Sequence, residues 1–139
     1  MHSDSPLLVW RRYNDAENRR DGPATQQLIS ESLTVTTNGR PAVTDSEHDA
    51  RIQQALYSRF PDFRRDFIGG IESGDTAVVR WVMRGTPVSP GPSLEVYGCS
   101  IVTVNEGRIV AAELYYCDSV LDGLVAETSA WTQGSEGNK

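Results

Sequence analysis

Two acidic residues interrupt an apolar stretch near the end of the chain. Glu113 lies within the run RIVAAELYYCD, and Asp118 ends that run. A carboxylate held in an apolar cavity gains pKa, because the loss of water penalises its charged form. Such a group can remove a proton next to a carbonyl when a nearby donor stabilises the resulting enolate. We therefore predict that Glu113 and Asp118 are catalytic acid–base residues.

Each of these carboxyl groups also has an ordinary structural explanation. Glu113 could form a salt bridge with Arg80 or Arg84 across a sheet. Asp118 could cap a helix that begins at Ser119. The sequence leaves both alternatives open.

A binding pocket for a small apolar molecule is expected beside these acids. Tyrosine hydroxyls there could donate a hydrogen bond to a developing oxyanion, and Trp81 with Met83 would form an apolar wall. Cys99 is not expected to be a nucleophile, because no histidine is placed to activate it. His48 is expected in the first turn of a helix, at the rim. The residues predicted to bind the substrate are Trp10, Tyr13, Tyr57, Trp81, Met83, Tyr97, Cys99 and Tyr115.

Helices are predicted in the first half of the chain. Ser5-Pro6 starts a helix that stops near Asp21, and Pro23 starts a second, shorter one. Thr44 and Glu47 form a capping box for a third helix that runs to about Arg59.

Strands are predicted from Phe63 onward, where the apolar period changes to two. Gly69-Gly70 indicates a bulge or sharp bend, and Asn38-Gly39 indicates a smaller hairpin earlier in the chain. On the last strand, alternation places Ile109, Glu113 and Tyr115 on one face. Both faces of that strand are largely apolar, which predicts that both are covered, the outer one by a second copy of the chain in a homodimer.

Length and charge restrict the class of protein. The chain has 139 residues and a net charge of −6, which fits one domain and argues against a nucleic-acid partner. We expect a single domain over residues 1–128 and a flexible tail over 129–139. With no apolar run long enough to span a membrane and no basic leader, a cytoplasmic protein without membrane contact is expected. The two cysteines, Cys99 and Cys117, lack metal-site spacing and are expected to be buried free thiols, so no metal is predicted.

Several short motifs occur in the order typical of one superfamily. The chain resembles the nuclear-transport-factor-2-like superfamily and, within it, the SnoaL-like polyketide cyclase group. The resemblance implies an α+β fold in which a curved, mostly antiparallel sheet forms a cone with N-terminal helices packed on its concave face. The motifs are Phe60-Pro61-Asp62, Gly74-Asp75, Val78-Val79-Arg80-Trp81, Arg84-Gly85-Thr86, Gly107-Arg108-Ile109-Val110 and Tyr115-Tyr116-Cys117-Asp118.

The resemblance also implies an activity. It suggests a cofactor-independent enzyme that acts on an apolar, carbonyl-bearing, polyketide-like substrate as a cyclase, isomerase or dehydratase. The chain departs from the group's pattern, because Pro87 stands where a histidine follows Gly-Thr and no histidine follows His48. Two alternatives therefore stay open: a non-catalytic protein that holds a hydrophobic ligand in the same pocket, and an accessory dimer whose cavity is filled.

Overall fold

Three helices precede the long strands. The computed structural model describes residues 5–118, 121, 123 and 124. Its helices are α1 (Pro6–Asn18), α2 (Gly22–Gln27) and α3 (Ser46–Arg59). The Ser5 hydroxyl accepts a hydrogen bond from the backbone N–H of Leu8, which satisfies one of the free donors at the start of α1. The predicted first helix is therefore confirmed, although it ends slightly before the predicted stop.

The cap of α3 lies one residue later than the capping box predicts. The Asp45 carboxylate, on an extended backbone, accepts a hydrogen bond from the N–H of His48 at 2.8 Å. Asp45 thus takes the position expected for Thr44, because its side chain reaches the N–H three residues on. Glu47 then lies in the first turn, where a negative charge stabilises the positive end of the helix dipole.

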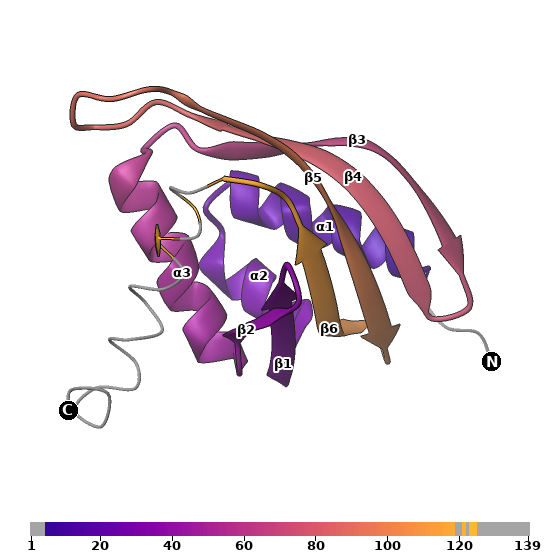
Figure 1. Cartoon of the computed structure of the whole chain (residues 1–139). Coiled ribbons are helices and arrows are strands. Elements are labelled where there is room, and N and C mark those ends of the chain that lie inside the picture. The colour runs from indigo at the N-terminus through magenta and orange to yellow at the C-terminus, as the bar shows by residue number, and fades with distance from the viewer. Residues whose placement is uncertain (1–4, 119–120, 122, 125–139) are drawn as a thin grey trace.

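The strands form one curved sheet of six strands in the order β2-β1-β6-β5-β4-β3 (Figure 1). Only the β1–β6 pair is parallel among the described pairs, and the others are antiparallel. The α+β class with a curved, mostly antiparallel sheet is therefore confirmed. The strands are β1 (Ile29–Thr37), β2 (Arg40–Val43), β3 (Arg64–Ser73), β4 (Thr76–Gly85), β5 (Leu94–Asn105) and β6 (Arg108–Tyr115).

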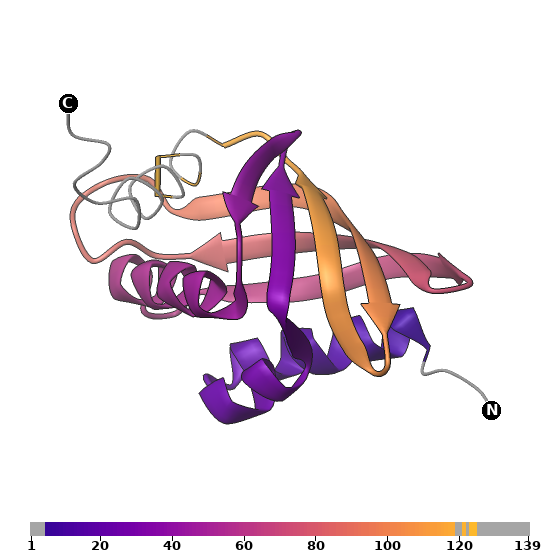
Figure 2. The same ribbon diagram turned by 90° about the horizontal axis from the view of Figure 1, so that it is seen from below.

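The helices lie on the concave side of this sheet (Figure 2). Helix α1 contacts β3 and β4, and α3 contacts β1 and β2 at the other end. Asn38 and Gly39 both have positive φ, at 52° and 84°, and form the tight β1–β2 turn that the sequence predicts. The sheet therefore curls around the helices and leaves an enclosed space between the two layers.

A bulge in β6 changes which side chains face that space. Val104 pairs with Ile109 and Thr103 pairs with Ala111, so that Val110 has no residue opposite. One extra residue reverses the alternation along the strand. The prediction that Ile109 shares a face of β6 with Glu113 is therefore wrong.

Ile109 instead shares the inner face with Ala112, Leu114 and Tyr116, all of which line the enclosed space. The outer face of β6 carries Glu113 and Tyr115, which are both exposed. A second bulge interrupts β3 between Phe67 and Gly69, where the sequence predicts a bend.

Other expectations concern the ends of the chain and its cysteines. Cys99 is half-buried, but Cys117 is exposed, so the prediction of two buried thiols is wrong for Cys117, which follows the end of β6. The predicted tail over 129–139 lies outside the described residues. Within the described part of the chain, no helix combines the length and the apolar character that a membrane crossing requires.

Trp81 of β4 packs closely against Gly98 of β5. Trp81 is fully buried, and its indole N–H donates a hydrogen bond to the Ser100 hydroxyl at 2.8 Å. Its ring lies so close to Gly98 that a Cβ added there would stand 2.5 Å from the Trp81 Cη2 atom. Gly98 is therefore the space into which the indole packs.

Replacing Gly98 by alanine should destabilise the fold. The methyl group would displace a buried indole, and overpacking of this kind costs about 1–3 kcal/mol in the free energy of unfolding. Urea denaturation of Gly98→Ala measures the loss. Gly22→Ala is the matched control, because nothing lies within 4 Å of a Cβ at that position. Equal stability of the two variants would contradict this packing.

Candidate functional site

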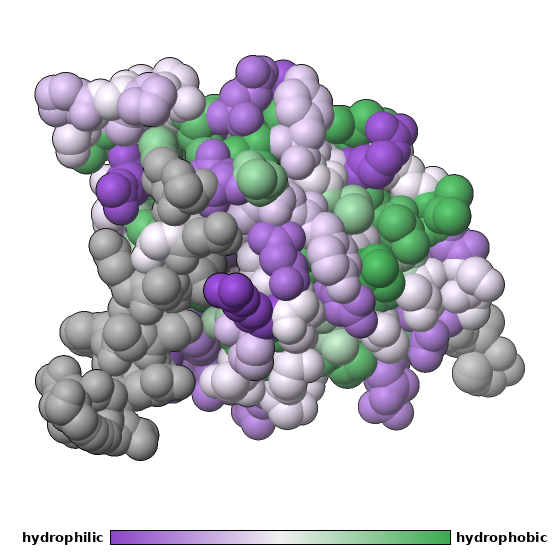
Figure 3. All heavy atoms as spheres, in the orientation of Figure 1, coloured by the Kyte–Doolittle hydropathy of each residue, from purple (hydrophilic) through white to green (hydrophobic). Residues whose placement is uncertain are grey.

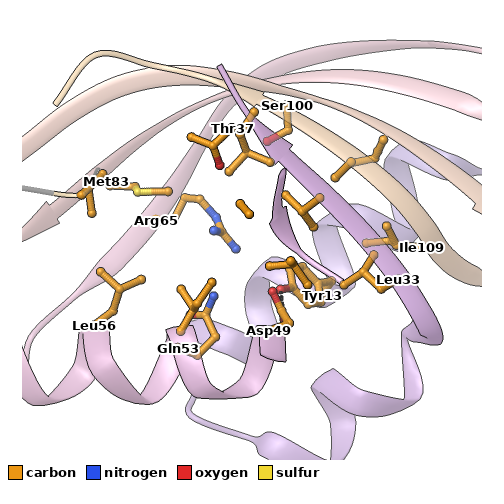
Figure 4. A pocket seen from close by; sticks show the side chains of 18 of the residues that line it. Tyr13, Leu33, Thr37, Asp49, Gln53, Leu56, Arg65, Met83, Ser100 and Ile109 are labelled. Atoms are coloured by element: carbon orange, nitrogen blue, oxygen red, sulfur yellow. Dashed lines mark hydrogen bonds between the residues drawn. The ribbon is translucent and has the colours of Figure 1, made fainter. Parts of the chain in front are cut away.

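A cavity lies between the concave face of the sheet and helices α1 and α3 (Figure 4). Its volume is about 90 Å³, well above the roughly 10–15 Å³ that one water molecule needs. Strands β1, β5 and β6 and helix α3 supply an apolar wall, which includes Leu33, Val35, Ile52, Leu56, Val102 and Leu114. The cavity therefore suits a small molecule that is mostly apolar.

Polar groups meet at one end of the cavity. Tyr13 of α1 donates a hydrogen bond through its hydroxyl to the Oδ2 atom of Asp49 on α3, at 2.9 Å. Both side chains are buried, at 8% and 6% exposure. Asp49 precedes Ile52 by three residues, so both project from the inner face of α3. Two helices far apart in the sequence thus bring a phenol and a carboxyl group together inside the protein.

Arg65 of β3 extends into the same end of the cavity (Figure 4). Its guanidinium forms a buried ion pair with Glu17, and its Nε donates to the Oδ1 atom of Asn14 at 2.7 Å. The guanidinium also lies 5.6 Å from the centre of the Trp10 ring and 5.8 Å from that of Tyr13. These contacts hold a permanent positive charge beside the Tyr13–Asp49 pair.

The surroundings of Asp49 raise its pKa to about 7. Burial is the main cause, and repulsion from Glu17 adds to it, whereas the Tyr13 hydrogen bond and the charge of Arg65 act in the opposite direction. Burial also raises the pKa of Tyr13 well above its usual value, with Asp49 and Glu17 contributing. Near neutral pH, Asp49 can therefore lose or gain a proton while Tyr13 stays a hydrogen-bond donor.

This arrangement combines three chemical functions: a carboxyl group that titrates near neutrality, a phenol donor and a guanidinium cation. A carbonyl oxygen placed near Tyr13 or Arg65 would be stabilised as negative charge develops on it. Among the described residues, no cluster of three or more histidine, cysteine or acidic side chains is placed to hold a metal ion.

Three of the predicted binding residues line the cavity, namely Trp10, Tyr13 and Met83. Trp81 is packed into the core beside the cavity-lining residues Ser100 and Tyr116, and does not line the cavity itself.

Tyr57 lies outside the main cavity. Its hydroxyl donates to the backbone carbonyl of Glu17 at 2.9 Å, and its ring lines a separate cavity between α2 and α3. Tyr57 follows Gln53 by four residues on the same stripe of α3, but it lines only the cavity between α2 and α3 among the described residues.

The remaining predicted binding residues lie on the outer face of the sheet. Tyr97 is 60% exposed and Tyr115 is 41% exposed, and Cys99 pairs with Tyr115 across β5 and β6. Their expected place in the pocket is wrong. The β6 bulge accounts for Tyr115, whereas Tyr97 and Cys99 alternate with the inward-facing Val96 and Ser100.

The two acids proposed from the sequence are also placed away from the cavity. Glu113 is exposed and accepts a hydrogen bond from the Tyr115 hydroxyl at 3.1 Å. In the described part of the chain, Glu113 also does not form the alternative salt bridge with Arg84, because Arg84 pairs with Glu95 and Asp66. Asp118 accepts a hydrogen bond from the backbone N–H of Leu121 at 2.9 Å, which is the helix-capping role left open above.

Asp49, Arg65 and Glu17 are not among the site residues predicted from the sequence. A usable signal existed for Asp49, because an acid on the same helical stripe as Ile52 and Leu56 faces the core. His48, in contrast, is buried rather than at the rim, and its two ring nitrogens have no hydrogen-bond partner among the described residues. Burial, followed by repulsion from Arg51, lowers the pKa of His48.

Solved structures share this architecture. Wild-type IdmH from Streptomyces antibioticus, a proposed polyketide cyclase, superposes with a TM-score of 0.74 at 21% identity, over 88% of this chain and 99% of that one. An NTF2-like protein of unknown function from Burkholderia pseudomallei gives 0.68 at 20% identity, over 91% and 99%. A protein with a ketosteroid isomerase-like fold from Catenulispora acidiphila, in complex with trimethylamine, gives 0.71 at 13% identity, over 85% and 92%.

Because these sequence identities are between 13% and 21%, the similarity to the three structures establishes the fold alone. No match to the sequence is found among the curated proteins. Residues 10–112, in contrast, match the SnoaL-like domain family, and they include most of α1, all of α3 and most of the sheet. The chain therefore belongs to the SnoaL-like domain family of the nuclear-transport-factor-2-like superfamily.

Proposed function

We propose that this protein is a cofactor-independent enzyme that acts on a small, apolar, carbonyl-bearing molecule by general acid–base chemistry. The observation that carries the proposal is the buried Tyr13–Asp49 hydrogen bond at the end of an apolar cavity. A carboxyl group with a pKa of about 7 is matched to proton abstraction at neutral pH.

In this reaction, ionised Asp49 removes a proton from the carbon next to the carbonyl. The electron pair of that C–H bond moves into the new C–C double bond, and the carbonyl electrons move onto oxygen. Once Asp49 carries the proton, it no longer needs the hydrogen bond from Tyr13, and the Tyr13 hydroxyl can turn to the enolate oxygen. Tyr13 and the positive charge of Arg65 then stabilise that oxygen, while the apolar wall excludes water. Return of the proton to another carbon completes an isomerisation. Alternatively, attack of the enolate carbon on a second carbonyl of the same molecule closes a ring, and the alkoxide that forms takes the proton back from Asp49.

The family supports a reaction of this class, because the SnoaL-like group resembled by the sequence contains polyketide cyclases. The similarity to IdmH, itself proposed to be such a cyclase, points the same way. A cyclase or isomerase acting on a polyketide-like substrate is therefore our first choice. A protein that binds the same ligand without turnover is the alternative.

We further propose that two copies associate through the outer face of the sheet. Tyr97 and Tyr115 expose large aromatic surfaces there, beside the half-buried Ile101. In Figure 3, hydrophobic areas on this side of the molecule are interspersed with polar ones. A two-fold interface would also allow Arg80 of one copy to approach Glu113 of the other, since both face outward.

Replacing Asp49 by asparagine should abolish proton abstraction. Loss of a general base lowers the rate by about 10²–10⁴-fold. Proton abstraction is measured by NMR in D₂O, as the exchange of α-protons for deuterium in a panel of apolar ketones of different sizes. The control is Glu47→Gln, which removes an exposed carboxylate from the same turn of α3. Equal exchange by both variants would rule out Asp49 as the base, and binding of ketones without any exchange by the wild type would favour the binding protein.

The same substitution should change how stability depends on pH. The pKa of Asp49 is about 7 in the folded protein and 3.8 as its ordinary value. Between about pH 4 and pH 7, Asp49 is more fully protonated in the folded state than in the unfolded state. The free energy of unfolding of the wild type therefore falls as the pH rises through this range. Asp49→Asn lacks this titration, and its stability relative to wild type should increase from about pH 4 to about pH 7 and then level off. Urea denaturation across this range measures the difference, and a constant difference would contradict the raised pKa.

The proposed dimer makes a separate prediction. Tyr97→Asp places a charge on the outer face and should weaken association by about 2 kcal/mol or more, as expected at an interface hot spot. Analytical ultracentrifugation measures the shift toward monomer. Leu8→Asp is the control, because Leu8 is an exposed apolar residue on α1. A wild-type protein that is already monomeric at high concentration would exclude the dimer.

A further inference from the structure

Asp49 lies between two cavities. One is the apolar cavity described above, here called the front cavity. The other lies between α2 and α3, has a volume of about 170 Å³, and is walled by Glu17, Asp49, Ala50, Gln53 and Tyr57, among others. We call it the rear cavity. Asp49 and Gln53 line both, so these two side chains form the partition between them.

The two cavities differ in the residues that surround them. Nearly every residue of the rear cavity has a polar or charged side chain, with Gly22 and Ala50 as the exceptions. The aliphatic parts of these side chains form much of the wall, and their polar ends can bind water. Gln54 and Gln26 are exposed at the surface, so the rear cavity opens to solvent between α2 and α3.

Two buried oxygen atoms of the lining residues indicate water as the occupant. Among the described residues, neither the Oε2 atom of Glu17 nor the Oε1 atom of Gln53 has a hydrogen-bond donor. Glu17 is 97% buried, given its exposure of 3%, and a buried oxygen without a donor is costly. A cavity of this size with several polar neighbours is the kind of site in which water satisfies such groups.

An apolar substrate in the front cavity would separate Asp49 from water on that side. With a pKa of about 7, Asp49 is partly protonated near neutral pH, and it must lose that proton to solvent before it can act as a base on a bound substrate. We propose that the rear cavity is a water route to Asp49, through which the carboxyl group exchanges protons with bulk solvent while the front cavity is occupied. This inference rests on the proposed function of Asp49 as a base.

The hydroxyl proton of Tyr13 reports on this route, because it lies in the hydrogen bond to Asp49. Its exchange with water can be measured by NMR in the full chain without substrate, and the Tyr13→Phe spectrum assigns the resonance. Ala112 lines only the front cavity and Ala50 only the rear one, as far as the described residues show, and both are half-buried. Ala112→Leu therefore fills the front cavity, and Ala50→Leu fills the rear cavity.

We expect Ala112→Leu alone to leave the exchange rate close to that of the wild type. Adding Ala50→Leu to it should slow exchange by about tenfold or more. The proposal is overturned if Ala112→Leu alone slows exchange to that extent, since the front cavity would then be the route, or if adding Ala50→Leu has no effect. Should the double variant not fold, Gln54→Trp replaces Ala50→Leu, because Gln54 is an exposed residue at the outer end of the rear cavity.

The two proposals fail in different ways. Loss of the base role would appear as unchanged α-proton exchange in Asp49→Asn, whereas loss of the water route would appear only in the exchange of the Tyr13 proton. The second measurement requires no turnover, so a result against the water route would leave the base assignment standing.

Discussion

One buried cation serves two buried carboxyl groups, and the character of the site depends on this imbalance. Arg65 is committed to Glu17 through a buried ion pair and is held by Asn14. Asp49 therefore receives only a phenol hydrogen bond and a more distant positive charge. Because a buried charge without a close counter-ion is unfavourable, the carboxyl group retains its proton to a higher pH. A second cation at this place would have made Asp49 an ordinary ion-pair partner.

The elements that hold this cluster come from three parts of the chain. Helix α1 supplies Tyr13, Asn14 and Glu17, helix α3 supplies Asp49, and strand β3 supplies Arg65. The Asn14 and Asn18 side-chain amides also donate to the backbone carbonyl of Arg65, each at 2.9 Å, and thereby fix the strand against the helix. The position of the guanidinium is thus determined by backbone contacts as well as by its charge.

The fold could be predicted from the sequence because the patterns that indicate its helices, turns and strands are local. Ser5-Pro6, Asn38-Gly39 and the alternation in β4 each report the conformation of a few neighbouring residues. Which side chains line the cavity depends instead on how the strands pair with one another. A single unpaired residue, Val110, decides that Glu113 faces outward, and no local pattern marks that bulge as Gly69-Gly70 marks the one in β3.

The polar end of the site was harder to predict for a different reason. Arg65 follows Arg64 in the sequence, and Asp49 lies close to Glu47 near the start of a helix, which are positions where charged side chains are usually exposed. Their burial results from tertiary packing of α1 against β3 and of α3 against β1, which neither segment encodes alone. Tyr13, Trp10 and Met83 were predicted because aromatic and soft side chains on apolar stripes are core candidates in any fold of this class.

The parallel pairing of β1 with β6 has a consequence for the order of assembly. β6 lies between β1 and β5, so the N-terminal hairpin has no neighbour in the sheet until residues 108–115 have left the ribosome. Contacts of such large sequence separation form late, because a long loop must close before they stabilise the chain. During synthesis, the β1–β2 hairpin therefore waits for β6, and the cavity beside Asp49 closes only after residues 108–115 have been made.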